Sequence, residues 1–224
     1  KDNDKNSKSN TGIVDLEDLG FYSSINNFDN EVEILHSRTL IRKVIEELDL
    51  YINYAAEGSF HNIELYKSSP IKVWITPEEA QKLSMPAYLN LSIQPGNKLN
   101  VKVSIGEQEY IKQFDKLPAL LTTPSGTFSF TPKDSIDIKS EQKIIVTVSS
   151  PYNVANDYRK ALNIEPTSQS TTIAQISVKS THRQRGMDFI NKLVEIYNRD
   201  ANDDKNEVAT KTAEFIDERI NIIN

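Results

Sequence analysis

The chain has 224 residues, of which 38% are hydrophobic and 26% charged, the balance of a folded globular protein rather than of a disordered one. Its net charge of -6 provides no positive field for a polyanion and disfavours nucleic-acid binding. There is no cysteine, which excludes disulfides, cysteine-ligated zinc and thiol nucleophiles.

Both ends of the chain indicate a piece of a longer protein. It begins at Lys1 without an initiator methionine, stops at Asn224 inside a predicted helix, and has no apolar run near the roughly 20 residues of a membrane-spanning helix. The opening KDNDKNSKSN contains only polar and charged residues. We therefore expect residues 1–28 to form a flexible N-terminal segment.

The first regular element is predicted to be a helix over residues 30–49. Glu31 and Glu33 suit the first turn of a helix, where negative charge is favourable, and apolar residues recur at intervals of three and four from Leu40 onward. Ser37 is a candidate position for a break and a new N-cap.

Strand signals follow this helix. Residues 51–55 and 60–66 flank a Glu57-Gly58 turn signal and are rich in tyrosine, isoleucine and phenylalanine, which favours a hairpin or a strand with a bulge. Residues 71–75 alternate apolar and polar side chains, as expected of a strand with one buried face. Pro77 is expected to end that strand.

Residues 77–143 are predicted to form an inserted β-rich subdomain, because alternating segments are separated by proline and glycine. Its clearest feature is a hairpin across the turn at 95–97. The expected facing positions are Leu89, Leu91 and Ile93 on one strand and Leu99, Val101 and Val103 on the other.

The last third of the chain alternates strand and helix signals. The predicted elements are a strand at 144–148, a helix after Ser150-Pro151, paired strands at 162–165 and 172–179, and a helix at 184–201. We expect the buried stripe of that last helix to contain Ile190, Leu193, Val194, Tyr197 and Ala201. The polar run at 202–205 is a candidate interruption.

A final helix is predicted from residue 205 to 224. Its candidate contact residues recur at spacings of four and three, the rhythm of a coiled coil: Val208, Thr212, Phe215, Arg219 and Ile222. We expect this helix to mediate self-association. Replacement of both Phe215 and Ile222 by charged residues is expected to weaken that association.

The predicted fold class is therefore α+β. A mixed sheet packs against helices in a body formed by residues 29–76 and 144–204, interrupted by the β-rich subdomain at 77–143 and followed by the start of a long C-terminal helix at 205–224.

The sequence contains no common catalytic signature: GxxxxGK[ST], GxSxG, HExxH and GxGxxG are all absent. The three histidines are far apart and lack a second ligand at helical spacing. We therefore predict no catalytic, cofactor-binding or metal-binding residue in this chain.

Two groups of residues are candidates for binding. Trp74 and Tyr66 offer aromatic faces for a sugar, although a single tryptophan on a strand is more often part of a core. Arg38 and Arg42 can pair with a partner subunit's carboxylates or an anionic sugar, and scattered surface bases are an equally good interpretation.

Two stretches together resemble the Wzz chain-length-determinant family. They are NEVEILHSRTLIRKVIEELDL at 30–50, and VANDYRKALNIEPTSQSTTIAQISVKSTHRQRGMDFINKLVEIYNRD at 154–200. The segment NEVATKTAEFIDERI at 206–220 is similar to the start of the long helix that follows in this family. The inserted region is similar to the larger external domains of Wzc-type tyrosine autokinases.

The resemblance implies the periplasmic domain of a bacterial inner-membrane polysaccharide co-polymerase. Such a domain is expected to be non-catalytic, to form a homo-oligomer, and to regulate the length and export of capsular or exopolysaccharide with a polymerase and an outer-membrane exporter. Transmembrane helices before residue 1 and after 224, and a kinase domain beyond them, are expected in the parent protein. A glycan-binding module that contacts the growing polymer is the alternative.

Overall fold

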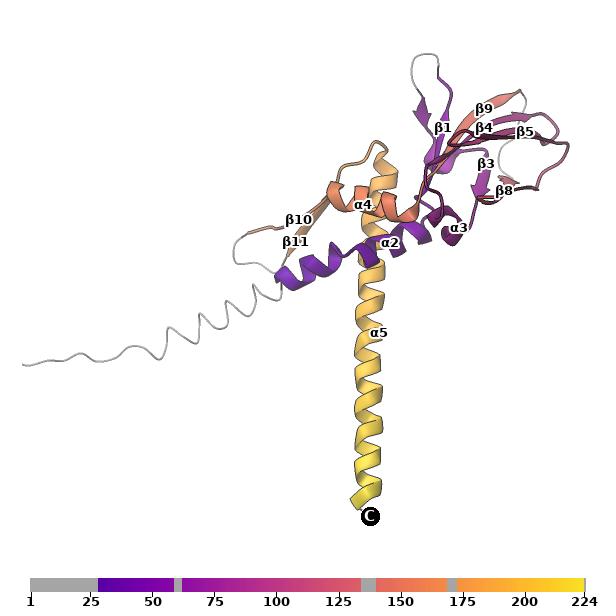
Figure 1. Ribbon diagram of the computed structural model, residues 1–224. Coiled ribbons are helices and arrows are strands. Elements are labelled where there is room, and N and C mark those ends of the chain that lie inside the picture. Colours follow the sequence, from indigo (N-terminus) through magenta and orange to yellow (C-terminus); the bar gives the residue numbers. More distant parts are fainter. Residues whose placement is uncertain (1–27, 59–61, 134–139, 169–172, 224) are drawn as a thin grey trace, which may run out of the picture.

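The computed structural model describes residues 28–58, 62–133, 140–168 and 173–223, with side chains described up to Arg219 (Figure 1). The predicted N-terminal segment at 1–28 lies outside the described residues except for Phe28, which is helical. The described chain is a mixed α+β structure with a long C-terminal helix, which confirms the predicted fold class.

The largest layer is a six-stranded sheet with the strand order β2-β1-β9-β4-β5-β6. Its strands are β1 (Ile52–Ala56), β2 (Ile63–Glu64), β4 (Ala87–Gln94), β5 (Lys98–Ile105), β6 (Gln108–Phe114) and β9 (Gln142–Val148). A three-stranded sheet contains β3 (Ile71–Trp74), β7 (Ala119–Thr123) and β8 (Gly126–Pro132). β10 (Leu162–Pro166) and β11 (Ala174–Val178) form a separate pair.

Every strand pairing in the described residues is antiparallel, where a mixed sheet was expected. The predicted insertion also shares its sheets with the body. β4 pairs with β9, and β8 pairs with β3, so the strands of 77–143 continue the layers formed by the flanking segments. Sequence alternation does not reveal this pairing because it specifies the face of a strand and not its neighbour.

The predicted central hairpin is confirmed in its register. Leu89 faces Val103, Leu91 faces Val101 and Ile93 faces Leu99, and all six side chains are buried. The turn contains Gly96 at φ +79° and Asn97 at φ +61°, backbone conformations that glycine and asparagine tolerate. The predicted hairpin between β1 and β2 is likewise present.

The two larger sheets pack through their apolar faces. Val101 and Val146 of the larger sheet belong to the same buried core as Phe128 and Phe130 of the smaller one. Tyrosine hydroxyls join the sheets at the edge of this core: Tyr54 donates to the Val73 carbonyl at 3.0 Å, and Tyr51 donates to the Ile75 carbonyl at 2.8 Å. Burial raises the pKa of both phenols, so the hydroxyls remain donors at neutral pH.

Helices pack below and beside the sheets. They are a helical segment at 28–35, α2 (Arg38–Glu47), α3 (Pro77–Gln81), α4 (Pro151–Ala161) and a short 3₁₀ turn, η1 (Tyr66–Ser68). The break predicted at Ser37 is present, and its side chain accepts a hydrogen bond from the Leu40 amide as an N-cap. The buried face of α2 consists of Leu40, Ile41, Val44 and Ile45.

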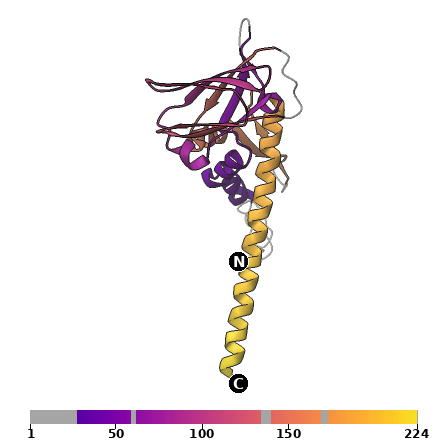
Figure 2. The same cartoon turned by 90° about the vertical axis from the view of Figure 1, so that its right-hand side faces the viewer.

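The C-terminal helix α5 (Arg183–Ile223) has 41 residues, which corresponds to a length of about 60 Å. It is continuous through residues 202–205, so the predicted interruption there is wrong. Its first part packs on the body, and its second part projects away from every other element (Figure 2). None of the described helices is long and apolar enough to cross a membrane.

Candidate functional site

The projecting half of α5 is the most unusual surface of the described chain. Every side chain from Asn202 to Arg219 is exposed. Three large apolar side chains are included, with exposed fractions of 65% for Val208, 56% for Phe215 and 50% for Ile216. An isolated helix in water would present polar residues at these positions, so large exposed apolar groups along this half indicate a surface for another helix.

The apolar residues of this half form two stripes. The alanine-isoleucine stripe contains Ala209, Ala213 and Ile216, and the sequence continues its spacing of four and three at Ile220 and Ile223. The heptad stripe contains Val208 and Phe215, and the sequence continues it at Ile222. At about 100° per residue the two stripes lie roughly 120° apart around the helix. Two separate apolar stripes suit a helix that contacts two neighbours.

The sequence predicted one of these stripes. Val208 and Phe215 are exposed as expected of contact residues, and the side chain of Ile222 lies outside the described residues. Thr212 and Arg219 lie between the stripes: the Thr212 hydroxyl donates to the Val208 carbonyl at 2.7 Å, and the Arg219 guanidinium lies 5.2 Å from the centre of the Phe215 ring. The alanine-isoleucine stripe was missed, although its regular spacing is visible in the sequence.

The first half of α5 is fixed to the body by ion pairs and by a buried aromatic contact. Asp200 contacts Lys43 of α2 at 2.7 Å, and Arg199 contacts Glu47 of α2 at 2.7 Å. Phe189 is fully buried, with its ring 4.5 Å from that of Tyr158 on α4. The body therefore determines the direction in which the exposed half projects.

The two predicted arginines on α2 have partners within the chain. Arg38 donates a hydrogen bond of 2.8 Å to the Tyr152 hydroxyl of α4 and lies 4.9 Å from the centre of that ring. Arg42 pairs with Glu46 on the next turn at 2.9 Å. These contacts join α2 to α4 and support the surface of α2, so neither arginine needs a second subunit to be satisfied.

The two predicted aromatic residues do not form one platform. The Tyr66 hydroxyl donates to Asp188 of α5 at 2.8 Å, which attaches η1 to that helix. Trp74 is 40% exposed on β3, and Ser129 of β8 lies opposite both Trp74 and the 65% exposed Leu120 of β7. Trp74 therefore shares a small exposed face with Leu120 instead of Tyr66.

A second feature is a groove of about 500 Å³ beside α4, with both polar and apolar lining, which we call the α4 groove. Its polar lining includes Asn53, Thr147, Asp157, Lys179, Thr181 and Arg185. They come from β1, β9, α4 and the start of α5, with the turn before it. The residues are far apart in the sequence, so no local motif could have predicted the groove.

Arg185 is the central charge of the α4 groove. Its side chain is 11% exposed, donates to Glu64 at 2.8 Å and to the Leu50 carbonyl at 2.6 Å, and fixes the start of α5 to β2 and to the turn before β1. Burial alone would raise the pKa of Glu64, but hydrogen bonds from Thr181 and Arg185 and the Arg185 charge outweigh it and lower the pKa. Burial raises the pKa of the Tyr158 hydroxyl in the same groove, and the Arg185 charge offsets part of this rise.

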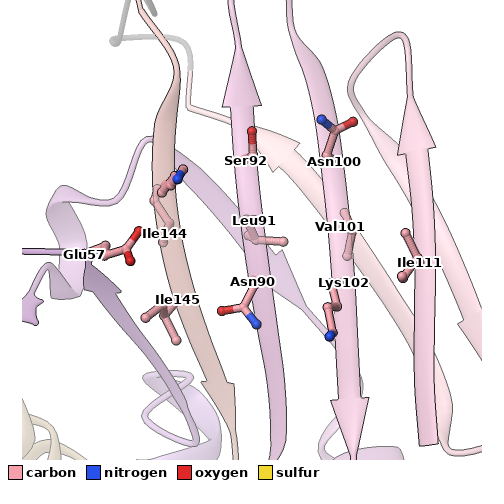
Figure 3. Close-up of a pocket in the computed structure, with 11 residues that line it drawn as sticks. Glu57, Asn90, Leu91, Ser92, Asn100, Val101, Lys102, Ile111, Ile144 and Ile145 are labelled. Atoms are coloured by element: carbon pink, nitrogen blue, oxygen red, sulfur yellow. The ribbon is translucent and has the colours of Figure 1, made fainter.

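A smaller groove of about 270 Å³ lies on the open face of the six-stranded sheet (Figure 3). Asn90 and Ser92 on β4 and Asn100 and Lys102 on β5 line it in adjacent cross-strand pairs. No side-chain polar atom of these residues is buried without a hydrogen-bond partner.

Within the described ranges, no group of three or more histidine, aspartate or glutamate side chains is arranged to hold a metal ion. In comparisons with known proteins, no family model matches the chain, and no curated protein matches it significantly.

Proposed function

We propose that the chain is the non-catalytic periplasmic domain of a bacterial polysaccharide co-polymerase that assembles through α5. In this proposal it regulates the length and export of a capsular or exopolysaccharide, together with a polymerase and an outer-membrane exporter. The parent protein is a Wzc-type tyrosine autokinase whose kinase domain lies outside this sequence. The sequence resemblance at 30–50 and 154–200 supports the family, and the exposed stripes of α5 support the assembly.

The main support for assembly is the pair of apolar stripes on the projecting half of α5, whose first half is fixed to the body. A second copy of this chain is the partner that brings a complementary stripe, because each copy carries both. When the alanine-isoleucine stripe of one copy contacts the heptad stripe of the next, each of the two copies still has one unpaired stripe. Further copies can add through the same contact, and the assembly closes into a ring when the last copy meets the first. Alanines in one stripe leave room for the larger Val208 and Phe215 in the other.

Sedimentation velocity tests the assembly directly. Ile216→Asp disrupts the alanine-isoleucine stripe, and Val208→Asp with Phe215→Asp disrupts the heptad stripe. We expect each variant to weaken self-association more than about tenfold, because an aspartate would be buried in an apolar contact. Thr210→Asp adds the same charge to the polar face of the helix and should leave association unchanged.

Mixing the two disrupted variants distinguishes the proposed contact from a symmetric one. Each variant retains the stripe that the other has lost, so the mixture should form a dimer of two different chains although each variant alone is monomeric. A native-like assembly of Ile216→Asp, or a mixture that remains monomeric, would reject the proposed contact.

Glycan binding at Trp74 is the second candidate function, favoured by the exposed indole on the same sheet face as Leu120. Because the chain has a single tryptophan, its fluorescence reports on that face alone. Titration with the polysaccharide of the source strain should shift the emission if the indole stacks on sugar rings. An unchanged spectrum at saturating polysaccharide would remove this candidate.

A further inference from the structure

The exposed face of the three-stranded sheet presents one aromatic ring, one aliphatic side chain and several hydroxyls. Trp74 on β3 and Leu120 on β7 both lie opposite Ser129 of β8, so the three side chains share this face, which we call the Trp74 face. Its other hydroxyls belong to Thr122, Thr127 and Thr131. An indole can stack on the apolar side of a sugar ring, and the hydroxyls can bond to those of the sugar.

Two lysines lie at one end of the Trp74 face. Lys72 is exposed on β3, opposite Thr131, and is two residues from Trp74, so its side chain leaves the strand on the same side as the indole, roughly 7 Å along. Lys133 directly follows β8, and its amide donates to the Pro70 carbonyl at 3.0 Å. The β3–β8 pairing therefore continues past Lys72 and brings Lys133 next to it.

Lys133 is the charge at this end that has no counter-ion. Lys72 pairs with Asp49 at 3.1 Å and Lys67 of η1 pairs with Asp188 of α5, but Lys133 takes part in none of the ion pairs of the described residues. Its ammonium group donates to the Lys67 carbonyl at 2.8 Å. Burial lowers the pKa of Lys133, and repulsion from the charges of Lys72 and Lys67 lowers this pKa further. A bound anion would offset that repulsion.

The opposite end of the Trp74 face disfavours an anion. The Glu79 carboxylate of α3 accepts hydrogen bonds from the Thr127 amide at 3.2 Å and from the Thr76 hydroxyl at 3.0 Å. The indole thus lies between a carboxylate and a group of lysines, which gives the face a direction. An acidic sugar fits both the ring and the lysines, whereas a phosphate ion or an acidic peptide pairs with the lysines and offers no sugar ring to the indole.

We propose that the Trp74 face binds an acidic saccharide, with one sugar ring stacked on the indole and its carboxylate paired with Lys133 next to Lys72. Trp74 and Lys133 are the main binding residues. The negative charge of the ligand follows from the lysines, and the choice of a saccharide rests on glycan binding at Trp74, the second candidate function above. To that candidate, the lysines add the charge of the polymer.

The test is a titration followed by the fluorescence of Trp74, the single tryptophan of the chain. The probes are polygalacturonate, dextran and poly-L-glutamate, an acidic glycan, a neutral glycan and an acidic polymer without sugar. We expect a saturable shift with polygalacturonate that weakens as the salt concentration rises, binding of dextran at least about tenfold weaker, and no shift with poly-L-glutamate.

The three probes separate the possible failures. Dextran that binds as tightly as polygalacturonate would overturn the acidic ligand and leave glycan binding at Trp74 in place. The same shift with poly-L-glutamate would overturn the saccharide. A spectrum that no probe shifts would overturn the acidic saccharide together with the glycan candidate. Assembly through α5 is measured separately by sedimentation, so a monomeric chain that still binds polygalacturonate would reject the assembly alone.

Lys133→Gln tests the site against a general effect of charge. Loss of this ammonium group should weaken polygalacturonate binding by about tenfold without lowering the Tm, because an unpaired charge is removed, and Lys133→Arg should retain most of the binding. The matched control is Lys98→Gln, which removes an exposed lysine at the start of β5 and should leave binding unchanged. Equal weakening in the two glutamine variants, or unchanged binding in Lys133→Gln, would overturn the proposal.

Discussion

Replacing Phe189 by alanine is expected to lower the free energy of unfolding by about 4 kcal/mol, within the range for truncation of a buried phenylalanine. The side chain is fully buried, and its ring packs on Tyr158 of α4 at 4.5 Å. The change leaves a cavity at the point where α5 meets the body, and α4 and α5 are each held by other contacts that prevent full collapse. Equilibrium denaturation followed by circular dichroism, at one fixed protein concentration, measures the loss.

Met187→Ala is the matched control for this prediction. Met187 lies two residues earlier on the same helix and is 45% exposed, so its truncation should cost less than about 1 kcal/mol. Because the orientation of the projecting half depends on this contact, Phe189→Ala should also weaken assembly of the native α5 surface. Equal stability losses in the two variants would show that the base of α5 is not packed as described.

The burial of Phe189 shows that the sequence of α5 does not determine which of its faces packs on the body. The predicted stripe included Leu193, which is buried, but also Val194, which is 37% exposed, and it omitted Phe189 and Ile196, which are fully buried. Apolar residues occur on more than one face of this helix because its two ends serve different contacts. A single period of 3.6 residues therefore identifies the helix and not the side that faces the body.

The continuity of α5 has a similar explanation. The run from Asn202 to Lys205 contains residues of modest helix propensity, but each costs less than about 0.7 kcal/mol, and none is a glycine or proline. The ion pair of Asp200 with Lys43 fixes the preceding turn. Propensity alone does not end a helix whose two flanks both favour it.

The central hairpin was predictable because everything that determines it is local. Strict alternation and a turn sequence at 95–97 specify both the register and the buried face. The α4 groove depends instead on contacts between distant segments, such as Arg185 of α5 with Glu64 of β2. The sequence placed Arg185 at the opening of a helix, but its burial and its partner follow only from the arrangement of the sheets.

The Arg185–Glu64 pair provides the last prediction. Glu64→Gln is expected to lower the free energy of unfolding at pH 7 by about 3 kcal/mol, because it leaves a largely buried guanidinium without a counter-charge. The exposed fractions of 11% for Arg185 and 16% for Glu64 place the loss at the lower end of the range for buried pairs. Glu47→Gln removes a carboxylate from the more exposed pairs with Arg199 and Lys192 and should cost less than about 1 kcal/mol.

The pH dependence distinguishes a lost charge from a lost hydrogen bond. The pKa of Glu64 is lower in the folded chain than its ordinary value of 4.5, so the folded state favours the ionised carboxylate. The stabilisation is fully present well above pH 4.5 and disappears as the pH falls through the folded pKa.

The stability difference between the native chain and Glu64→Gln, followed by denaturation from pH 7 to pH 3, should therefore narrow below pH 4.5. A constant difference over that range would mean that the carboxylate charge contributes nothing and that only the hydrogen bonds of Glu64 matter. Taking the difference between variants removes the parallel contribution of Asp188, whose pKa is also lowered, against its burial, by Lys67 and Tyr66.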